Sequence, residues 1–290
     1  MAPSSTALRP SELVEGSVKL SSPPLIYERL MEVINHPRGG AADVAYVIRE
    51  DTALTARLLK VVNSAFFSFP RRIDTVSQAV TVVGTTQVRD LALATSVVAL
   101  FKDIPPDLMD MDGFWKHSLA CGVAARVLAS LRREGNVERY FVTGILHDVG
   151  KLVLCLRAPE EFRDVLEGAR GNDRLLHEME RQALGFDHAQ VGEALLDLWN
   201  MPANLREAVR FHHQPRRAER FPLEAAAVHV ADVVANALGM GNGGEDLVPD
   251  LVPQAWDQLG LHPDLMGPAV EDLEQQFQAA VHLLGLEASP

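Results

Sequence analysis

The stretch Gly144-Ile145-Leu146-His147-Asp148-Val149-Gly150-Lys151 places an imidazole beside a carboxylate within an otherwise apolar run. Apolar runs of this kind are buried in folded proteins, and a buried charge is rarely tolerated without a partner because it has lost its hydration. The carboxylate of Asp148 therefore needs compensation, either from a structural salt bridge or from a metal ion. Which of the two applies depends on the polar residues elsewhere in the chain.

Candidate metal ligands recur along the chain, each within an apolar pattern of helical spacing. They are His117, His188, His212, His213 and Asp232. Residues so far apart in sequence can meet only where several helices converge, which is how helical bundles build metal sites in their cores. Together with His147 and Asp148 they form a dispersed set of imidazoles and carboxylates.

This ligand set can be divided between two divalent ions. A first ion would be held by two imidazoles and two carboxylates, from His117, His147, Asp148 and Asp232. That mixture of donors suits Fe, Mn, Zn or Co. A second ion would be held by His188, His212 and His213. We expect Asp148 to bridge the two ions, because neighbouring side chains on a helix lie about 100° apart and its carboxylate can fall between two metal positions.

A dinuclear centre of this kind favours phosphate esters, since two dications attract anionic oxygen and can activate water for attack on phosphorus. Lys151 follows Asp148 by three positions and so lies on roughly the same helix face. Its ammonium could contact a phosphate oxygen, and the alternative is a lysine whose head group reaches solvent. Asp148 and Lys151 are therefore the candidate catalytic residues.

Each candidate ligand also has a purely structural interpretation. A lone histidine can be satisfied by packing, a histidine pair can form a solvated helix end, and an aspartate can cap a helix or form a salt bridge. These separate explanations must account independently for the fact that the polar exceptions on these helices are all His or Asp, whereas one metal centre explains them together. The remaining histidines are interpreted as surface or packing residues: His36, His177, His229, His262 and His282.

The composition excludes several classes of protein. The 290 residues are 47% hydrophobic with a net charge of -12, which predicts a globular chain and opposes binding to nucleic acid or an anionic membrane surface. Cys121 and Cys155 lack CxxC spacing and predict no disulfide framework, which fits a reducing compartment. No apolar run approaches the roughly 20 residues that cross a bilayer, and no signal-peptide pattern is found. We expect a soluble, cytoplasmic protein.

The hydrophobic spacing is helical throughout, and the alternation typical of strands is nowhere sustained, so the fold class is all-α. One long helix is predicted at 114–131, and a single further helix from about 137 to 156 is predicted to carry His147 and Asp148. The predicted parts are a flexible N-terminal arm at 1–22, a first helical part at 23–107, a second at 108–240, a glycine-rich linker at 239–244 and a C-terminal helical extension at 245–290.

Several blocks of the sequence together resemble the HDOD domain of bacterial signalling proteins over about residues 20–240. The blocks are Leu54 to Phe66, Ile73 to Gly84, Gly144 to Lys151, Gly185 to Trp199 and Phe211 to Pro215. HDOD domains are similar to the HD-superfamily metal-dependent phosphohydrolases, which include the HD-GYP cyclic-di-GMP phosphodiesterases, but are generally regarded as regulatory or of unknown activity. The resemblance implies a multi-helical fold in which an N-terminal helical subdomain (23–107) packs on an HD-like subdomain (108–240).

The resemblance also bears on the site. The seven candidate ligands each match a metal-binding position of the HD-GYP enzymes, which implies a mononuclear or dinuclear centre of Fe or Mn. The sequence differs from the HD-GYP enzymes at two places, and both differences put the phosphodiesterase activity in question. The segment Gln214-Pro215-Arg216-Arg217 stands where the GYP stretch is expected, and Gly113 stands where a glutamate ligand of a third metal is expected.

Two functions follow from these observations. The first is a regulatory signalling module, with a metal that is structural, ligand-sensing or vestigial, whose partners are signalling proteins docked on the N-terminal helices or a nucleotide ligand. The second is a metal-dependent phosphohydrolase that acts on a nucleotide or cyclic nucleotide. Neither interpretation includes a nucleic-acid or membrane partner.

Overall fold

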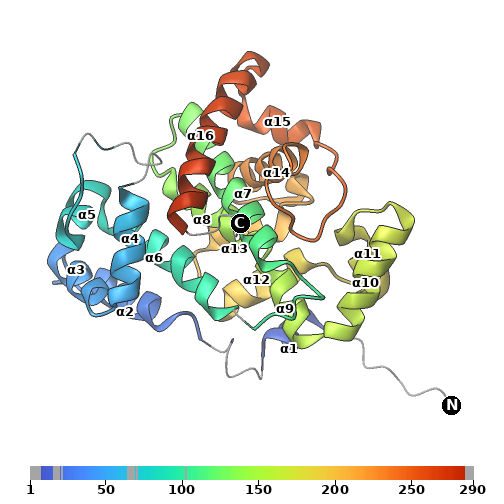
Figure 1. Ribbon diagram of the computed structural model, residues 1–290, viewed down its shortest axis with the longest axis horizontal. Coiled ribbons are helices and arrows are strands. Elements are labelled where there is room, and N and C mark those ends of the chain that lie inside the picture. Colours follow the sequence, from blue (N-terminus) through green and yellow to red (C-terminus); the bar gives the residue numbers. More distant parts are fainter. Residues whose placement is uncertain are drawn as a thin grey trace.

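The computed structural model describes residues 8–15, 20, 22–63, 69, 71–101 and 103–284. Within these residues the chain consists of helices joined by turns and contains no strand, so the predicted all-α class is confirmed (Figure 1). In this part of the chain, none of the helices combines the length and the apolar character needed to cross a membrane.

The N-terminal subdomain is a group of short helices around one longer one. Its helices are α2 Leu25–Asn35, α3 Ala41–Arg49, α4 Thr52–Val62, α5 Val76–Val83 and α6 Thr85–Leu100. The carboxylate of Asp51 accepts a hydrogen bond from the Leu54 N–H at 2.8 Å and caps α4. Gly84, with a φ of 102°, separates α5 from α6. In Figure 1, α2 to α5 lie on one side of α6, which also packs on α8.

The predicted HD-like subdomain, 108–240, is built around one buried helix, α7. Its elements are α7 Met111–Leu131, α8 Glu138–Leu146, α9 Val149–Arg157, α10 Pro159–Asn172, α11 Leu176–Leu184, α12 His188–Leu198, α13 Ala203–Phe211, the 3-10 turn η1 Pro215–Arg217 and α14 Pro222–Ala237. Helices α7 and α8 cross in backbone contact, because a Cβ on Gly144 would lie 2.6 Å from the Cys121 carbonyl oxygen. Helix α14 packs on the same central helix.

The predicted single helix over 137–156 is wrong, because the chain breaks at His147 and Asp148. The Nδ1 of His147 lies 2.7 Å from the carbonyl oxygen of Gly144, to which it donates, and Asp148 leaves the helical region with φ -98° and ψ 6°. The apolar pattern continues across the break and so does not reveal it. The break matters for the site because it brings both side chains toward α14 and α12.

Part of the predicted flexible arm at 1–22 is packed against the rest of the protein. Residues 1–7, 16–19 and 21 of the predicted flexible arm lie outside the described residues, whereas Pro10–Val14 form helix α1 against α9 and α12. Leu13 and Val14 are buried there, so this piece of the arm is packed.

The C-terminal extension packs on both subdomains. It contains α15 Pro253–Leu259, the 3-10 turn η2 Pro263–Leu265 and α16 Met266–Leu284. Helix α16 packs along α7 and also contacts α4, while α15 packs on α14 (Figure 1). Leu273 and Phe277 of α16 are buried against the core.

Asn63, in one of the sequence blocks that resemble HDOD domains, joins the end of α4 to the start of the next segment. Its Nδ2 donates to the carbonyl oxygens of Leu59 at 2.8 Å and Ile73 at 2.7 Å, and its Oδ1 accepts from the Ile73 N–H at 2.6 Å. The amide thus connects two backbone segments that enclose residues 64–72. The remainder of the block, Ser64 to Phe66, lies outside the described residues.

We predict that Asn63→Ala lowers the free energy of unfolding by about 2 kcal/mol, because three side-chain hydrogen bonds worth about 0.5–1.5 kcal/mol each are lost. Urea denaturation measures the change. Thr81→Ala, which removes one exposed bond to the Ser77 carbonyl, is the control and should stay within about 0.5 kcal/mol of the unaltered protein. An Asn63→Ala protein as stable as this control would contradict the assigned role.

Candidate metal centre

The structure brings all seven sequence-predicted ligands together at the centre of the HD-like subdomain. They come from α7 (His117), the α8–α9 turn (His147, Asp148), the start of α12 (His188), the end of α13 (His212, His213) and α14 (Asp232). Six of the side chains belong to residues that are at most 4% exposed, and His213 is half-buried. Seven titratable groups with so little exposure need mutual or metal compensation.

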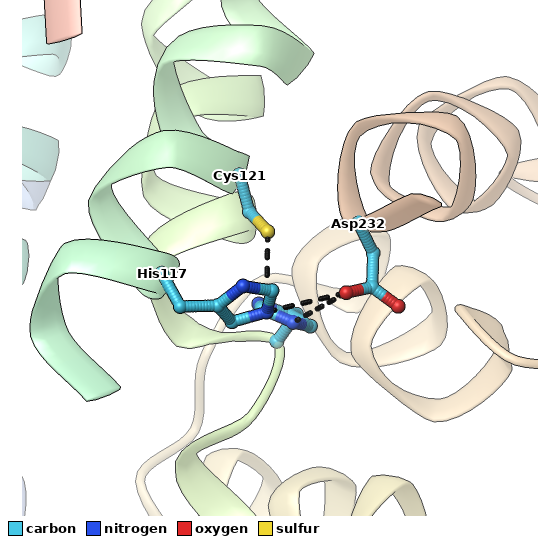
Figure 2. A group of neighbouring side chains, drawn as sticks. His117, Cys121 and Asp232 are labelled. Carbon is cyan, nitrogen blue, oxygen red and sulfur yellow. Dashed lines mark hydrogen bonds and ion pairs between the residues drawn. The ribbon is translucent and has the colours of Figure 1, made fainter. Parts of the chain in front are cut away.

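The first group of donors lies between α7 and α14. The Nε2 of His117 is 3.2 Å from the Asp232 Oδ1 and 3.5 Å from the Cys121 Sγ, and the Nε2 of His147 is 3.8 Å from the same Asp232 oxygen. Figure 2 shows His117 and Cys121 on one helix facing Asp232 on another. The ligand atoms of these four residues all lie within 4.8 Å of one another, close enough to share one ion.

The second group of donors contains Asp148 and three imidazoles. The Asp148 Oδ1 is 3.0 Å from the His188 Nε2 and 3.8 Å from the His212 Nε2. The Nε2 atoms of His188 and His213 are 2.9 Å apart. These four residues also have ligand atoms within 4.8 Å of one another.

Asp148 lies between the two groups. Its second oxygen, Oδ2, is 3.3 Å from the His147 Nε2 and 3.7 Å from the His117 Nε2, whereas Oδ1 faces His188 and His212. A carboxylate that presents one oxygen to each group has the position expected of a bridging ligand. The bridging role itself stays a prediction.

The orientation of the imidazoles fits metal binding. The Nδ1 of His147 donates to the Gly144 carbonyl and that of His212 to the Val209 carbonyl, both at 2.7 Å, while the Nε2 atoms of these two rings have no hydrogen-bond partner. The Nδ1 of His188 donates to the Glu180 carboxylate at 2.6 Å. Metal-binding histidines are typically held in this way, with one nitrogen bonded to a carbonyl or carboxylate and the other aimed at the ion.

The charges of the centre are strongly coupled. Burial opposes ionisation of Asp148, but His147 and Lys151 outweigh it and hold the pKa of the carboxyl well below its ordinary range. Burial would lower the pKa of His147, yet the neighbouring Asp148 and Asp232 raise it to about 10. Burial has the largest effect on His212, and the positive charge of His147 acts in the same direction. Together they lower the pKa of the ring to about 3, so the imidazole is neutral at pH 7 and can offer a lone pair to a metal ion.

Lys151 neither points into an open phosphate site nor reaches solvent, the two positions expected from the sequence. Its Nζ donates to the Asp148 Oδ2 at 2.7 Å and the residue is only 3% exposed, so the alternative of a solvent-reaching lysine is wrong. Contact with a phosphate oxygen, the predicted catalytic role, would require the ammonium to leave this partner. Gly150 beside it presses α9 against α12, because a Cβ there would lie 1.9 Å from the His188 carbonyl oxygen.

Sequence reasoning missed several residues of the site. Glu180 is fully buried and accepts from both the backbone N–H and the ring of His188, and the Asn236 amide donates to the Asp232 Oδ1 at 2.8 Å. Cys121 follows His117 by one helical turn, a spacing that could have revealed it. His177 and His229 are packing residues, as predicted: His177 stacks on His213 at 4.0 Å between ring centroids, and His229 donates to the His212 carbonyl.

The glycine-rich segment 239–244, predicted to be a linker, covers the donors. A Cβ on Gly243 would lie 2.9 Å from both the Asp148 Oδ2 and the His117 Cδ2. The segment is held at both ends, since the Asn242 N–H donates to the Gly113 carbonyl at 3.0 Å and the Glu245 carboxylate accepts from the Leu176 N–H at 2.8 Å. The segment therefore packs directly against two of the donors, Asp148 and His117.

The fold and the site define an all-helical protein with a buried histidine–aspartate centre where α7, α12, α13 and α14 meet the α8–α9 turn. The chain belongs to the HDOD domain family, whose model matches residues 20–215. The resemblance found in the sequence is thereby confirmed.

Similar proteins extend over most of the chain. An uncharacterized protein of Treponema pallidum is 26% identical over 220 residues, which are 74% of this chain and 42% of that relative, so the chain spans less than half of its length. The crystal structure of a "putative phosphohydrolase" from Shewanella amazonensis matches with a TM-score of 0.71 and 25% identity over 90% of this chain and 93% of that one. A "putative signal transduction protein" from Marinobacter aquaeolei shares the fold, with a TM-score of 0.69 and 22% identity over 91% of this chain and 59% of that one.

We predict that Gly243→Val lowers the free energy of unfolding by about 1–3 kcal/mol, because the new side chain must displace Asp148, His117 or the segment itself. Thermal or urea unfolding measures the loss. The control is Gly171→Val on α10, where an added Cβ meets no atom within 4 Å. Equal stability of the two variants would show that segment 239–244 is not packed on the donors.

Proposed function

We propose that the chain is a cytoplasmic regulatory protein of bacterial signal transduction whose buried centre binds one or two divalent ions. The observation that carries this proposal is the closed, pre-oriented ligand set: the Nε2 atoms of His147 and His212 lack hydrogen-bond partners and face Asp148 beneath segment 239–244. A covered centre suits an ion that stabilises or senses a conformation better than one that must meet a substrate.

The donors divide naturally between two ions. The first would be held by His117, His147 and Asp232, and the second by His188, His212 and His213, with Asp148 between them. Bound there, divalent ions would supply charge stabilisation and an activated water. The protein's own contribution is to fix the rings through Gly144, Val209 and Glu180. Iron or manganese remains the expectation from the resemblance.

Signalling proteins are the partners that we propose, docked on the N-terminal helices. Leu25, Tyr46 and Val82 expose 69%, 58% and 51% of their surface on α2, α3 and α5 and offer apolar contacts to such a partner. A nucleotide ligand is the alternative partner. The net charge of -12 continues to oppose a nucleic-acid or membrane partner.

A metal-dependent phosphohydrolase acting on a nucleotide or cyclic nucleotide is the second candidate. Two donor groups that share Asp148 favour it, and so does the 25% identity with the "putative phosphohydrolase" of Shewanella amazonensis. In this case segment 239–244 would open, and Lys151 would exchange Asp148 for a phosphate oxygen.

We predict that saturating Mn²⁺, Fe²⁺ or Zn²⁺ raises the Tm by about 8 °C, because an ion bound only by the folded state at a thousand times its Kd adds about 4 kcal/mol of stability, at roughly 2 °C per kcal/mol. Differential scanning fluorimetry with and without chelator measures the shift. Asp148→Asn should reduce the shift, because the second donor group loses its carboxylate, whereas Asp164→Asn, an exposed aspartate on α10, should retain it in full.

A screen of phosphate esters with added metal decides between the two candidate functions. It compares the unaltered protein with Asp148→Asn and with Tyr46→Ala. The regulatory proposal predicts no metal-dependent turnover. Turnover that is lost in Asp148→Asn and retained in Tyr46→Ala, on the exposed N-terminal surface, would contradict the regulatory proposal and establish the phosphohydrolase.

A further inference from the structure

Cys121 lies inside the first donor group, although the HD-type ligand set contains no cysteine at this position. The residue is fully buried on α7, one turn after His117, and its Sγ faces the same space as Asp232 (Figure 2). Its ligand atom lies within 4.8 Å of those of His117, His147 and Asp232.

The two distances from the His117 Nε2 to Asp232 and Cys121 are close to those around a four-coordinate ion. With bonds near 2.0–2.1 Å to nitrogen or oxygen and 2.3 Å to sulfur, the edges of a tetrahedron are about 3.3 Å between nitrogen and oxygen and about 3.6 Å between nitrogen and sulfur. The observed separations from the His117 Nε2 are 3.2 Å to the Asp232 Oδ1 and 3.5 Å to the Cys121 Sγ. The His147 Nε2 lies somewhat farther from that oxygen, at 3.8 Å.

We propose that Cys121 is a metal ligand and that the first group binds Zn²⁺ through two imidazoles, one carboxylate and one thiolate. The inference rests on the proposed metal centre and specifies its first ion. Zinc binds cysteine as the thiolate, so its binding releases the thiol proton to solvent. A thiolate favours zinc over manganese, which prefers oxygen donors, and this ion therefore differs from the iron or manganese that the resemblance implies.

The composition of this group also fixes the role of its ion. Four protein donors complete a tetrahedral shell, which is typical of structural zinc sites, whereas catalytic zinc keeps one position for water. The first ion then stabilises the crossing of α7 with α8 and α14, and any exchange of ligands is left to the second group around His188, His212 and His213. This division agrees with the regulatory proposal.

The other cysteine offers a matched control. Cys155, on α9, is as deeply buried as Cys121, at 1% and 0% exposure, but it belongs to neither donor group. Replacing each by alanine removes the same atoms from the core, so a difference in metal binding between the two variants reports coordination and not packing.

The test uses the metal-free full-length chain and Co²⁺, whose thiolate complexes show an intense near-ultraviolet charge-transfer band. We expect the first equivalent of Co²⁺ to produce this band together with the visible bands of tetrahedral cobalt. Cys155→Ala should retain it. Cys121→Ala should lose it, and its preference for Zn²⁺ over Mn²⁺ in competition should fall by more than about tenfold.

A measurement on the unaltered protein keeps the proposal testable if Cys121→Ala does not fold. X-ray absorption at the zinc edge should find one sulfur at about 2.3 Å from the first zinc equivalent. Bound metal without sulfur, or a charge-transfer band that persists in Cys121→Ala, would overturn the role of Cys121 while leaving the metal centre intact. Absence of any bound Co²⁺ or Zn²⁺ would overturn the proposed metal centre as well.

Discussion

The buried carboxylate of Asp148 is the constraint on which the rest of this structure depends. At 1% exposure it has given up its hydration, and it is compensated by the Lys151 ammonium at 2.7 Å and by imidazoles on both sides. These partners reside on different helices, so satisfying one charge brings α7, α12 and the end of α13 around the α8–α9 turn. The same convergence creates two groups of donor atoms on either side of the carboxylate.

The helices that surround this centre also contact the N-terminal helices and the C-terminal extension. Segment 239–244 closes over the donors with Gly243 in contact, and it is anchored on α7 through Gly113 and on α11 through Glu245. Helix α6 of the N-terminal subdomain packs on α8, which leads directly into His147, and α16 packs along α7 while contacting α4. An ion bound at the centre would therefore act on α7 and α8, which contact α16 and α6, and this is the physical argument for the regulatory role that we propose.

Much of this arrangement could be predicted from the sequence, for reasons that also explain the failures. Helical spacing and isolated polar residues identified the all-α fold and the seven histidines and aspartates, because a His or Asp in an apolar stripe needs a partner. The break at His147 arises from a side-chain bond to Gly144 that leaves no trace in hydrophobic periodicity. Cys121 was read as an apolar core residue although it follows His117 by one helical turn, and Gly243 resembled a linker residue, since only the folded chain shows which surface a glycine approaches. The sequence did not predict the packing of α1, because Leu13 and Val14 are only two neighbouring apolar residues in a stretch that is otherwise rich in Ser and Pro.

The most direct test of the central claim is the metal content per chain, determined by elemental analysis of protein purified without added metal. The account predicts one or two equivalents of transition metal in the unaltered chain and a loss of at least one in Asp148→Asn, which keeps the volume of the side chain and removes its charge. Complete absence of metal from both, persisting after reconstitution with zinc, iron or manganese under reducing conditions, would contradict the account. The centre would then be a metal-free network of charges around Lys151.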